Sequence, residues 1–142
     1  MLLPTIAMAQ TDYIAPLIDK YSSLNNCSTV VLSGEMLKSM GANSGVKSMQ
    51  AIAVEDPAMI DEFSTDIAKI TSGYALLMSV NSNGSNIKIY RVIQYYKQSN
   101  KSKHQELEDI LIIAINGNEG IAVRLTGNNI ELSEATSLIN IN

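Results

Sequence analysis

Histidine and cysteine, the side chains that most often serve as bases, nucleophiles or metal ligands, are almost absent from this chain. His104 is the only histidine and Cys27 is the only cysteine. A serine-type triad would need an aspartate that the fold brings to His104, and a zinc site needs three or four ligands. Because His104 stands among lysines in a polar stretch, we expect it in a solvated loop. The sequence therefore predicts no metal site, no cofactor and no catalytic residue.

A pair of carboxylates acting as general acid and base is the second chemistry to consider. Asp61, Glu62 and Asp66 fall within a predicted helix, on the face opposite Phe63 and Ile67. Acids on the polar face of a helix are usually solvated, and we expect that here. The alternative function that stays open is a small hydrolase or lyase. Its site would be assembled from carboxylates and tyrosines that are distant in sequence.

The charges are segregated along the chain. Residues 55–66 hold five acids and no base, whereas residues 67–105 hold six bases and no acid. Tyrosines lie among those bases, and aromatic rings interleaved with basic groups bind anionic glycans or the acidic patch of a partner protein. In the alternative interpretation, the tyrosines pack the sheet and the lysines solubilise an edge hairpin. The predicted binding residues are Tyr90, Arg91, Tyr95, Tyr96, Lys97, Lys101 and Lys103.

The first ten residues read as the end of a secretory signal peptide. After an apolar stretch, Ala7 and Ala9 form the small-x-small pattern of a cleavage site, and a polar chain begins at Gln10. We therefore expect residues 1–9 to be a residual signal segment and the mature protein to be periplasmic or secreted. No basic region precedes the apolar stretch, so Met1 is interpreted as an internal start or as the result of a truncated gene model. A lipid anchor would need a cysteine where Gln10 stands.

Length and composition limit the architecture and the partners. The chain has 142 residues, 46% of them apolar and 17% charged, which is typical of a folded chain, and we expect residues 10–142 to form one domain. A net charge of -4 argues against nucleic acid as a partner. One cysteine forms no intramolecular disulfide. The longest apolar run, residues 110–115, is too short to span a membrane.

Apolar periodicity and turn residues predict the elements that would position any site. Residues Asn83-Gly84 and Asn116-Gly117 are hairpin-turn signals, and residues 97–105 read as a polar loop. The predicted helices cover residues 13–24, 33–41, 56–73 and 131–138. The first three are expected to have N-terminal caps at Asp12, Ser33 and Asp56, and Pro57 is expected in the first turn of the third. The predicted strands cover residues 28–32, 46–54, 74–80, 87–95, 107–115 and 121–125.

The order of these elements, α-β-α-β-α-β-β-β-β-α, indicates an α+β fold. It ends in hairpins and lacks regular βαβ units, so we expect a largely antiparallel sheet of about six strands packed with three to four short helices. Residues 107–115 are nearly continuously apolar. That pattern is typical of a central strand buried on both faces.

The pattern of apolar positions and turns resembles a family known as domain of unknown function 4252. The likeness runs through residues 18–22, 30–40, 73–92 and 110–138. The family consists of small exported bacterial proteins, some with a lipoprotein cysteine, which this chain lacks at Gln10. The resemblance implies export and assigns no activity and no site.

Taken together, the absence of reactive groups and the Tyr/Lys stretch favour a binding function. We expect an exported, non-enzymatic module of the cell envelope. Its expected partner is an envelope protein or an anionic glycan.

Overall fold

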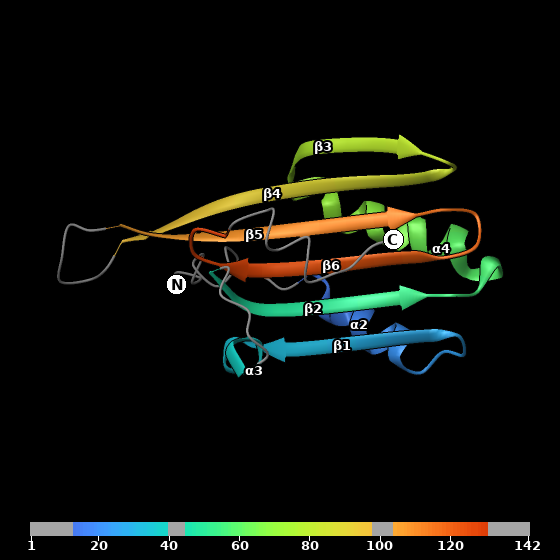
Figure 1. The fold of residues 1–142 in the computed structure, drawn as a ribbon, viewed down its shortest axis with the longest axis horizontal. Helices are drawn as coiled ribbons and strands as arrows, with labels where there is room; N and C mark the ends of the chain where they lie inside the picture. Colours follow the sequence, from blue (N-terminus) through green and yellow to red (C-terminus); the bar gives the residue numbers. More distant parts are fainter. Residues whose placement is uncertain (1–12, 40–44, 98–103, 131–142) are drawn as a thin grey trace, which may run out of the picture.

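A computed structural model describes residues 13–39, 45–97 and 104–130, with the backbone alone for residues 93–97 and 104–107. These residues form a six-stranded sheet in the order β1-β2-β6-β5-β4-β3, with every neighbouring pair antiparallel (Figure 1). The α+β class predicted from the sequence is confirmed. The strands are β1 (Cys27–Ser33), β2 (Val46–Val54), β3 (Ala75–Ser82), β4 (Ser85–Lys97), β5 (His104–Ile115) and β6 (Gly120–Gly127).

Three α-helices accompany this sheet in the described part of the chain. They are α2 (Ala15–Ser22), α3 (Gly34–Ser39) and α4 (Ile60–Ile70), and α4 is flanked by the short 3-10 turns η1 (Pro57–Met59) and η2 (Thr71–Gly73). The predicted helix over residues 131–138, the predicted cap at Asp12 and the predicted cleavage site at Ala7, Ala9 and Gln10 lie outside the described residues. No helix of the described part is long and apolar enough to cross a membrane.

The starts of two helices follow from local capping. The Asp56 side chain accepts a hydrogen bond from the backbone N–H of Ala58 at 3.0 Å, and Pro57 occupies the first turn, where its missing N–H costs nothing. Ser33 accepts a hydrogen bond from the N–H of Met36 at 3.3 Å. Both caps are confirmed as the sequence predicted them.

The turn between β3 and β4 is also as predicted. Asn83 and Gly84 have φ angles of 52° and 82°, which is the left-handed pair that a two-residue hairpin loop requires. Asparagine and glycine adopt this conformation at the lowest cost. This turn fixes β3 as the neighbour of β4.

The main core lies between the sheet and the helices α2 and α4, on what we call the helix face. Tyr21 of α2 and Phe63 of α4 meet edge to face, with ring centroids 5.5 Å apart. Both are fully buried and pack with Ile52, Leu111 and neighbouring side chains. Gly120 permits this approach, because a Cβ there would lie 2.8 Å from the Phe63 ring. A larger residue would push α4 off the sheet.

The opposite side of the sheet, the second face, carries a separate core. Ile110 and Ile112 of β5 pack there with Leu125 of β6 and with Leu37 of α3. Successive residues of a strand point to opposite faces. Leu111 and Ile112 are each 1% exposed, so β5 is buried on both faces. The prediction of a central strand is confirmed.

Strands β4 and β5 extend further than the sequence predicted. Their ladder continues to the pair Lys97 and His104, beyond the ends of β3 and β6, and forms a two-stranded ribbon. The predicted loop over residues 97–105 is therefore wrong at Lys97, His104 and Gln105, and His104 lies in a strand and not in a loop. The pattern failed here because backbone pairing in such a ribbon needs no apolar side chains.

Candidate binding surface

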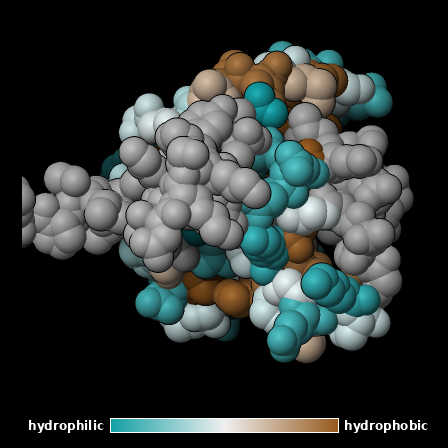
Figure 2. Space-filling model, turned by 90° about the vertical axis from the view of Figure 1, so that its left-hand side faces the viewer, coloured by the Kyte–Doolittle hydropathy of each residue, from teal (hydrophilic) through white to brown (hydrophobic). Residues whose placement is uncertain are grey.

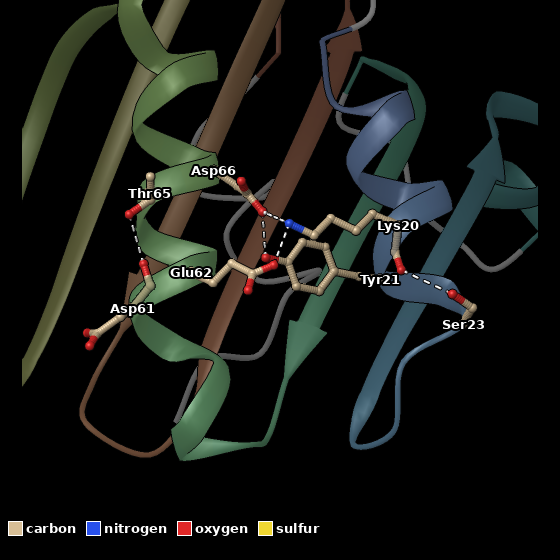
Figure 3. A network of polar contacts seen from close by, with 7 residues as sticks. All are labelled: Lys20, Tyr21, Ser23, Asp61, Glu62, Thr65 and Asp66. Carbon is tan, nitrogen blue, oxygen red and sulfur yellow. Dashed lines mark hydrogen bonds and ion pairs between the residues drawn. The ribbon is translucent and has the colours of Figure 1, made fainter.

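A polar network joins α2 to α4 above the helix-face core (Figure 3). The Tyr21 hydroxyl donates a hydrogen bond to Oδ2 of Asp66 at 2.7 Å, and Lys20 Nζ reaches the same oxygen at 2.7 Å. Lys20 also forms an ion pair with Glu62 at 2.6 Å. Two adjacent residues of α2 thus bind two carboxylates one turn apart on α4.

The electrostatics of this network point to a structural role. Burial raises the pKa of the Asp66 carboxyl, but the hydrogen bonds from Lys20 and Tyr21 outweigh burial and hold this pKa below its ordinary value. Burial and then the hydrogen bond to Asp66 raise the pKa of the Tyr21 hydroxyl. A carboxylate that stays ionised beside a phenol that stays protonated does not exchange protons near neutral pH.

The prediction that Asp61, Glu62 and Asp66 form a solvated face is therefore wrong for Asp66. Its side chain is only 12% exposed. The sequence carried a signal for this contact in Lys20 and Tyr21. These two residues place a base and a phenol side by side on α2.

A second polar cluster lies on the helix face at another part of the sheet. The guanidinium of Arg124 donates three hydrogen bonds of 2.8 to 3.2 Å to the two carboxylate oxygens of Asp109. A third nitrogen of the same guanidinium donates to Gln50 at 3.0 Å. Burial and the nearby Asp109 raise the pKa of the Tyr74 hydroxyl, which hydrogen-bonds within this cluster. The polar groups of Arg124, Asp109, Gln50 and Tyr74 therefore form hydrogen bonds with one another within the cluster.

The second face holds a further buried carboxylate. Glu108 forms an ion pair with Arg91 at 3.3 Å and accepts a hydrogen bond of 2.7 Å from the backbone N–H of Ile130. The carboxylate therefore attaches the segment after β6 to the sheet. These contacts explain why Glu108, at 4% exposed, is tolerated inside the protein.

The structure does not gather the predicted binding residues on one surface. Tyr90 packs against the helix-face core, whereas its neighbour Arg91 lies on the second face beside Glu108. The backbone of Tyr95, Tyr96 and Lys97 belongs to the ribbon, where they pair with residues 104–106. Lys101 and Lys103 lie outside the described residues.

Of the two edge strands, β3 exposes four large apolar side chains, whereas β1 exposes two, Val30 and Val31. All eight residues of β3 are exposed. They include Leu76, Leu77, Met78 and Val80, which are 53%, 43%, 45% and 40% exposed. Figure 2 shows apolar surface at the top of the molecule, where Figure 1 places β3.

Soluble proteins usually protect such an edge. Lysine, proline or a covering helix keeps an edge strand from pairing with another chain. Residues 75–82 contain no charged residue and no proline. Within residues 13–39, 45–97 and 104–130, the protective feature that the structure shows at this edge is a bulge between Leu76 and Met78. The sequence predicted a strand here, but its position at the edge depends on a strand order that one sequence does not show.

A family model described as domain of unknown function (DUF4252) matches residues 21–138. The chain belongs to this family. No curated protein and no solved structure matches it. The match begins at Tyr21 and runs past β6, so it includes the whole described sheet, the open edge strand β3 and every member of the polar clusters except Lys20.

Proposed function

We propose that this DUF4252 protein is an exported, non-enzymatic binding module of the cell envelope that holds an extended segment of a partner protein along β3. The observation that carries the proposal is the exposed, uncharged and largely apolar edge strand. A folded protein that leaves such an edge open exposes itself to aggregation. A partner strand that covers the edge removes this liability and gives the edge a function.

Strand addition fits the chemistry of this edge. One side of β3 pairs with β4, and among the described residues no strand pairs with its other side. An added strand would use the backbone groups of that side for affinity and would use side-chain contacts for specificity. Leu76 pairs with Tyr90 on the helix face, whereas Met78 and Val80 pair with Ile89 and Ile87 on the second face. The partner strand would therefore meet apolar side chains on both of its faces.

The charges near β3 indicate which charge the partner should carry beside the segment that pairs with β3. β3 itself is neutral, so the segment that pairs with it should be apolar and uncharged. Beyond Ala75 the ribbon of β4 and β5 continues to the pair Lys97 and His104, and Lys101 and Lys103 stand between these two residues in the sequence. We therefore propose that the partner is a protein with an acidic segment flanking its apolar strand. A glycan would make no use of the backbone groups of β3.

Site-specific photo-crosslinking tests this proposal. A benzophenone amino acid at Ser79 of β3 should give a cross-linked adduct in cells, and mass spectrometry should map the adduct to one extended segment of another envelope protein. The matched control places the same group at Ser28 of β1, on the opposite edge of the sheet. No adduct, or equal adducts at both edges, would contradict the proposal. An adduct between two copies of this chain would show self-association instead.

Charge substitutions test separately the contribution of the three lysines and that of the strand β3. Replacing Lys97, Lys101 and Lys103 with Glu should weaken the adduct at Ser79, whereas Lys47→Glu on β2, four strands away from β3 in the sheet order, should not. Met78→Lys should remove the adduct altogether. An adduct that survives Met78→Lys would exclude β3 as the contact.

A further inference from the structure

A cavity of about 510 Å³ opens at one end of the sheet. It lies where β2 ends and where the β3–β4 and β5–β6 turns come together. Its size falls within the range of about 300 to 1,000 Å³ that is typical of small-molecule sites. Neither the polar clusters nor the proposed strand contact on the outer side of β3 uses it.

The floor of the cavity is one row of side chains across four strands. Ala53 pairs with Ile121, Ile121 with Ala114, and Ala114 with Ile87. The two alanines have no atoms beyond Cβ, so the sheet surface is low on either side of Ile121. The next row contains Val123 and Ile112, which are buried. The cavity therefore arises because Ala53 and Ala114 are small, and the larger side chains of Val123 and Ile112 bound it on one side.

The rim of the cavity is polar and acidic. Glu55 follows β2, and Glu119 precedes β6. Both side chains are exposed, and their carboxylates have no ion pair among the described residues. Asn116 fixes the rim, because its side chain accepts hydrogen bonds from the N–H groups of Asn118 and Glu119. No lysine, arginine or histidine is among the described residues that line the cavity.

We infer that this cavity binds a small amphiphilic cation. Its apolar body would lie on the row formed by Ala53, Ile121, Ala114 and Ile87, and its ammonium group would lie at the rim near Glu55 and Glu119. An apolar floor and acidic rim complement such a ligand in both shape and charge. An anion of the same shape would meet two carboxylates and no base. This inference is independent of the strand contact on β3.

Octylammonium and octanoate are suitable probes because they share an apolar chain and differ in charge. In ¹⁵N–¹H NMR titrations of the whole protein, octylammonium should shift the amide signals of residues 53–55 and 114–121, and octanoate should not. Ala114→Leu fills the floor and should abolish these shifts. The matched control, Ala68→Leu, makes the same change on the exposed side of α4 and should leave them intact.

The double substitution Glu55→Gln and Glu119→Gln tests the rim. It should weaken octylammonium binding about tenfold, the size expected for the loss of two exposed ion pairs. Glu35→Gln on α3 is the control and should have no effect. The inference is overturned if octylammonium does not bind, if octanoate binds equally well, or if the double variant binds as the original protein does. Should Ala114→Leu fail to fold, the probe pair and the double variant still decide.

Discussion

The hydroxyl of Tyr21 donates its hydrogen bond to Asp66 across 45 positions of sequence, with 2.7 Å between the two oxygens. The ring of the same side chain meets the Phe63 ring, so α2 and α4 are joined through Tyr21 by both an apolar and a polar contact. The relative position of the two helices therefore depends on Tyr21.

Substitutions at Tyr21 should separate its two contributions. Tyr21→Phe keeps the ring and removes the hydrogen bond, so the free energy of unfolding should fall by about 1 kcal/mol. Tyr21→Ala also removes a fully buried ring and should cost about 3 to 5 kcal/mol. Urea unfolding measures both values. Tyr13→Phe is the control, since Tyr13 is 51% exposed, and it should be neutral. Equal losses for Tyr21→Phe and Tyr13→Phe would show that the hydrogen bond contributes nothing.

The contribution of Asp66 should depend on pH. Because its pKa is lower in the folded chain than in the unfolded chain, the unfolded chain binds more protons and stability rises with pH in that window. The contribution is complete above the ordinary carboxyl pKa of about 3.9 and is lost as pH falls through the folded value. The difference in unfolding free energy between the original protein and Asp66→Asn should therefore be constant near neutral pH and shrink in acid. A difference that does not change between neutral and acid pH would contradict this prediction.

Truncations in β5 test whether both faces of the sheet contribute to stability. Leu111→Ala and Ile112→Ala should each cost about 2 to 5 kcal/mol in urea unfolding, because each removes a buried side chain from a different core. Leu76→Ala on the exposed edge should cost a few tenths of a kcal/mol. A nearly neutral Ile112→Ala beside a severe Leu111→Ala would mean that the second face is open in solution.

The ion pair between Arg124 and Asp109 should be costly to break from one side. Asp109→Asn leaves the buried guanidinium without its counter-charge, and such changes cost about 3 to 5 kcal/mol. Glu62→Gln, in the exposed pair with Lys20, is the control and should cost less than about 1 kcal/mol. Similar losses in urea unfolding for the two variants would show that the Arg124 pair is not desolvated.

The prediction that the chain is exported and cleaved can be tested at its N-terminus. When the chain is expressed behind an upstream basic and apolar segment, the periplasmic product should begin at Gln10, after Ala9. Intact-mass spectrometry of that product decides the matter. Replacing Ala7 and Ala9 with bulky residues should prevent cleavage. A full-length product that stays in the cytoplasm would remove the basis for an envelope function.

Local features of the fold could be predicted from the sequence, and long-range features could not. The cap at Asp56 and the turn at Asn83-Gly84 depend on residues only a few positions apart, and the structure has both. The partners of Asp66 depend on how α2 and α4 pack. Asp66 was predicted on a solvated face of α4, but Lys20 and Tyr21 of α2 contact it there. The exposure of β3 depends on the strand order across the whole sheet. Strand alternation alone predicts that Tyr90 and Arg91 point to opposite faces of the sheet. What each side chain contacts on its face depends on the elements that pack there, and the sequence does not show these.

The ladder between β2 and β6 joins residues far apart in the chain, such as Gln50 and Arg124, which are 74 positions apart. The strands from β3 to β6 are successive hairpins, and β1 and β2 are connected through α3. Closing the long loop between β2 and β6 costs more chain entropy than forming any hairpin, so we expect this ladder to close late in folding. As β6 is the last described strand to be synthesised, the sheet stays in two pieces until β6 has left the ribosome. During that interval the two pieces expose apolar side chains, such as Ile52 and Ile112, that the complete sheet buries.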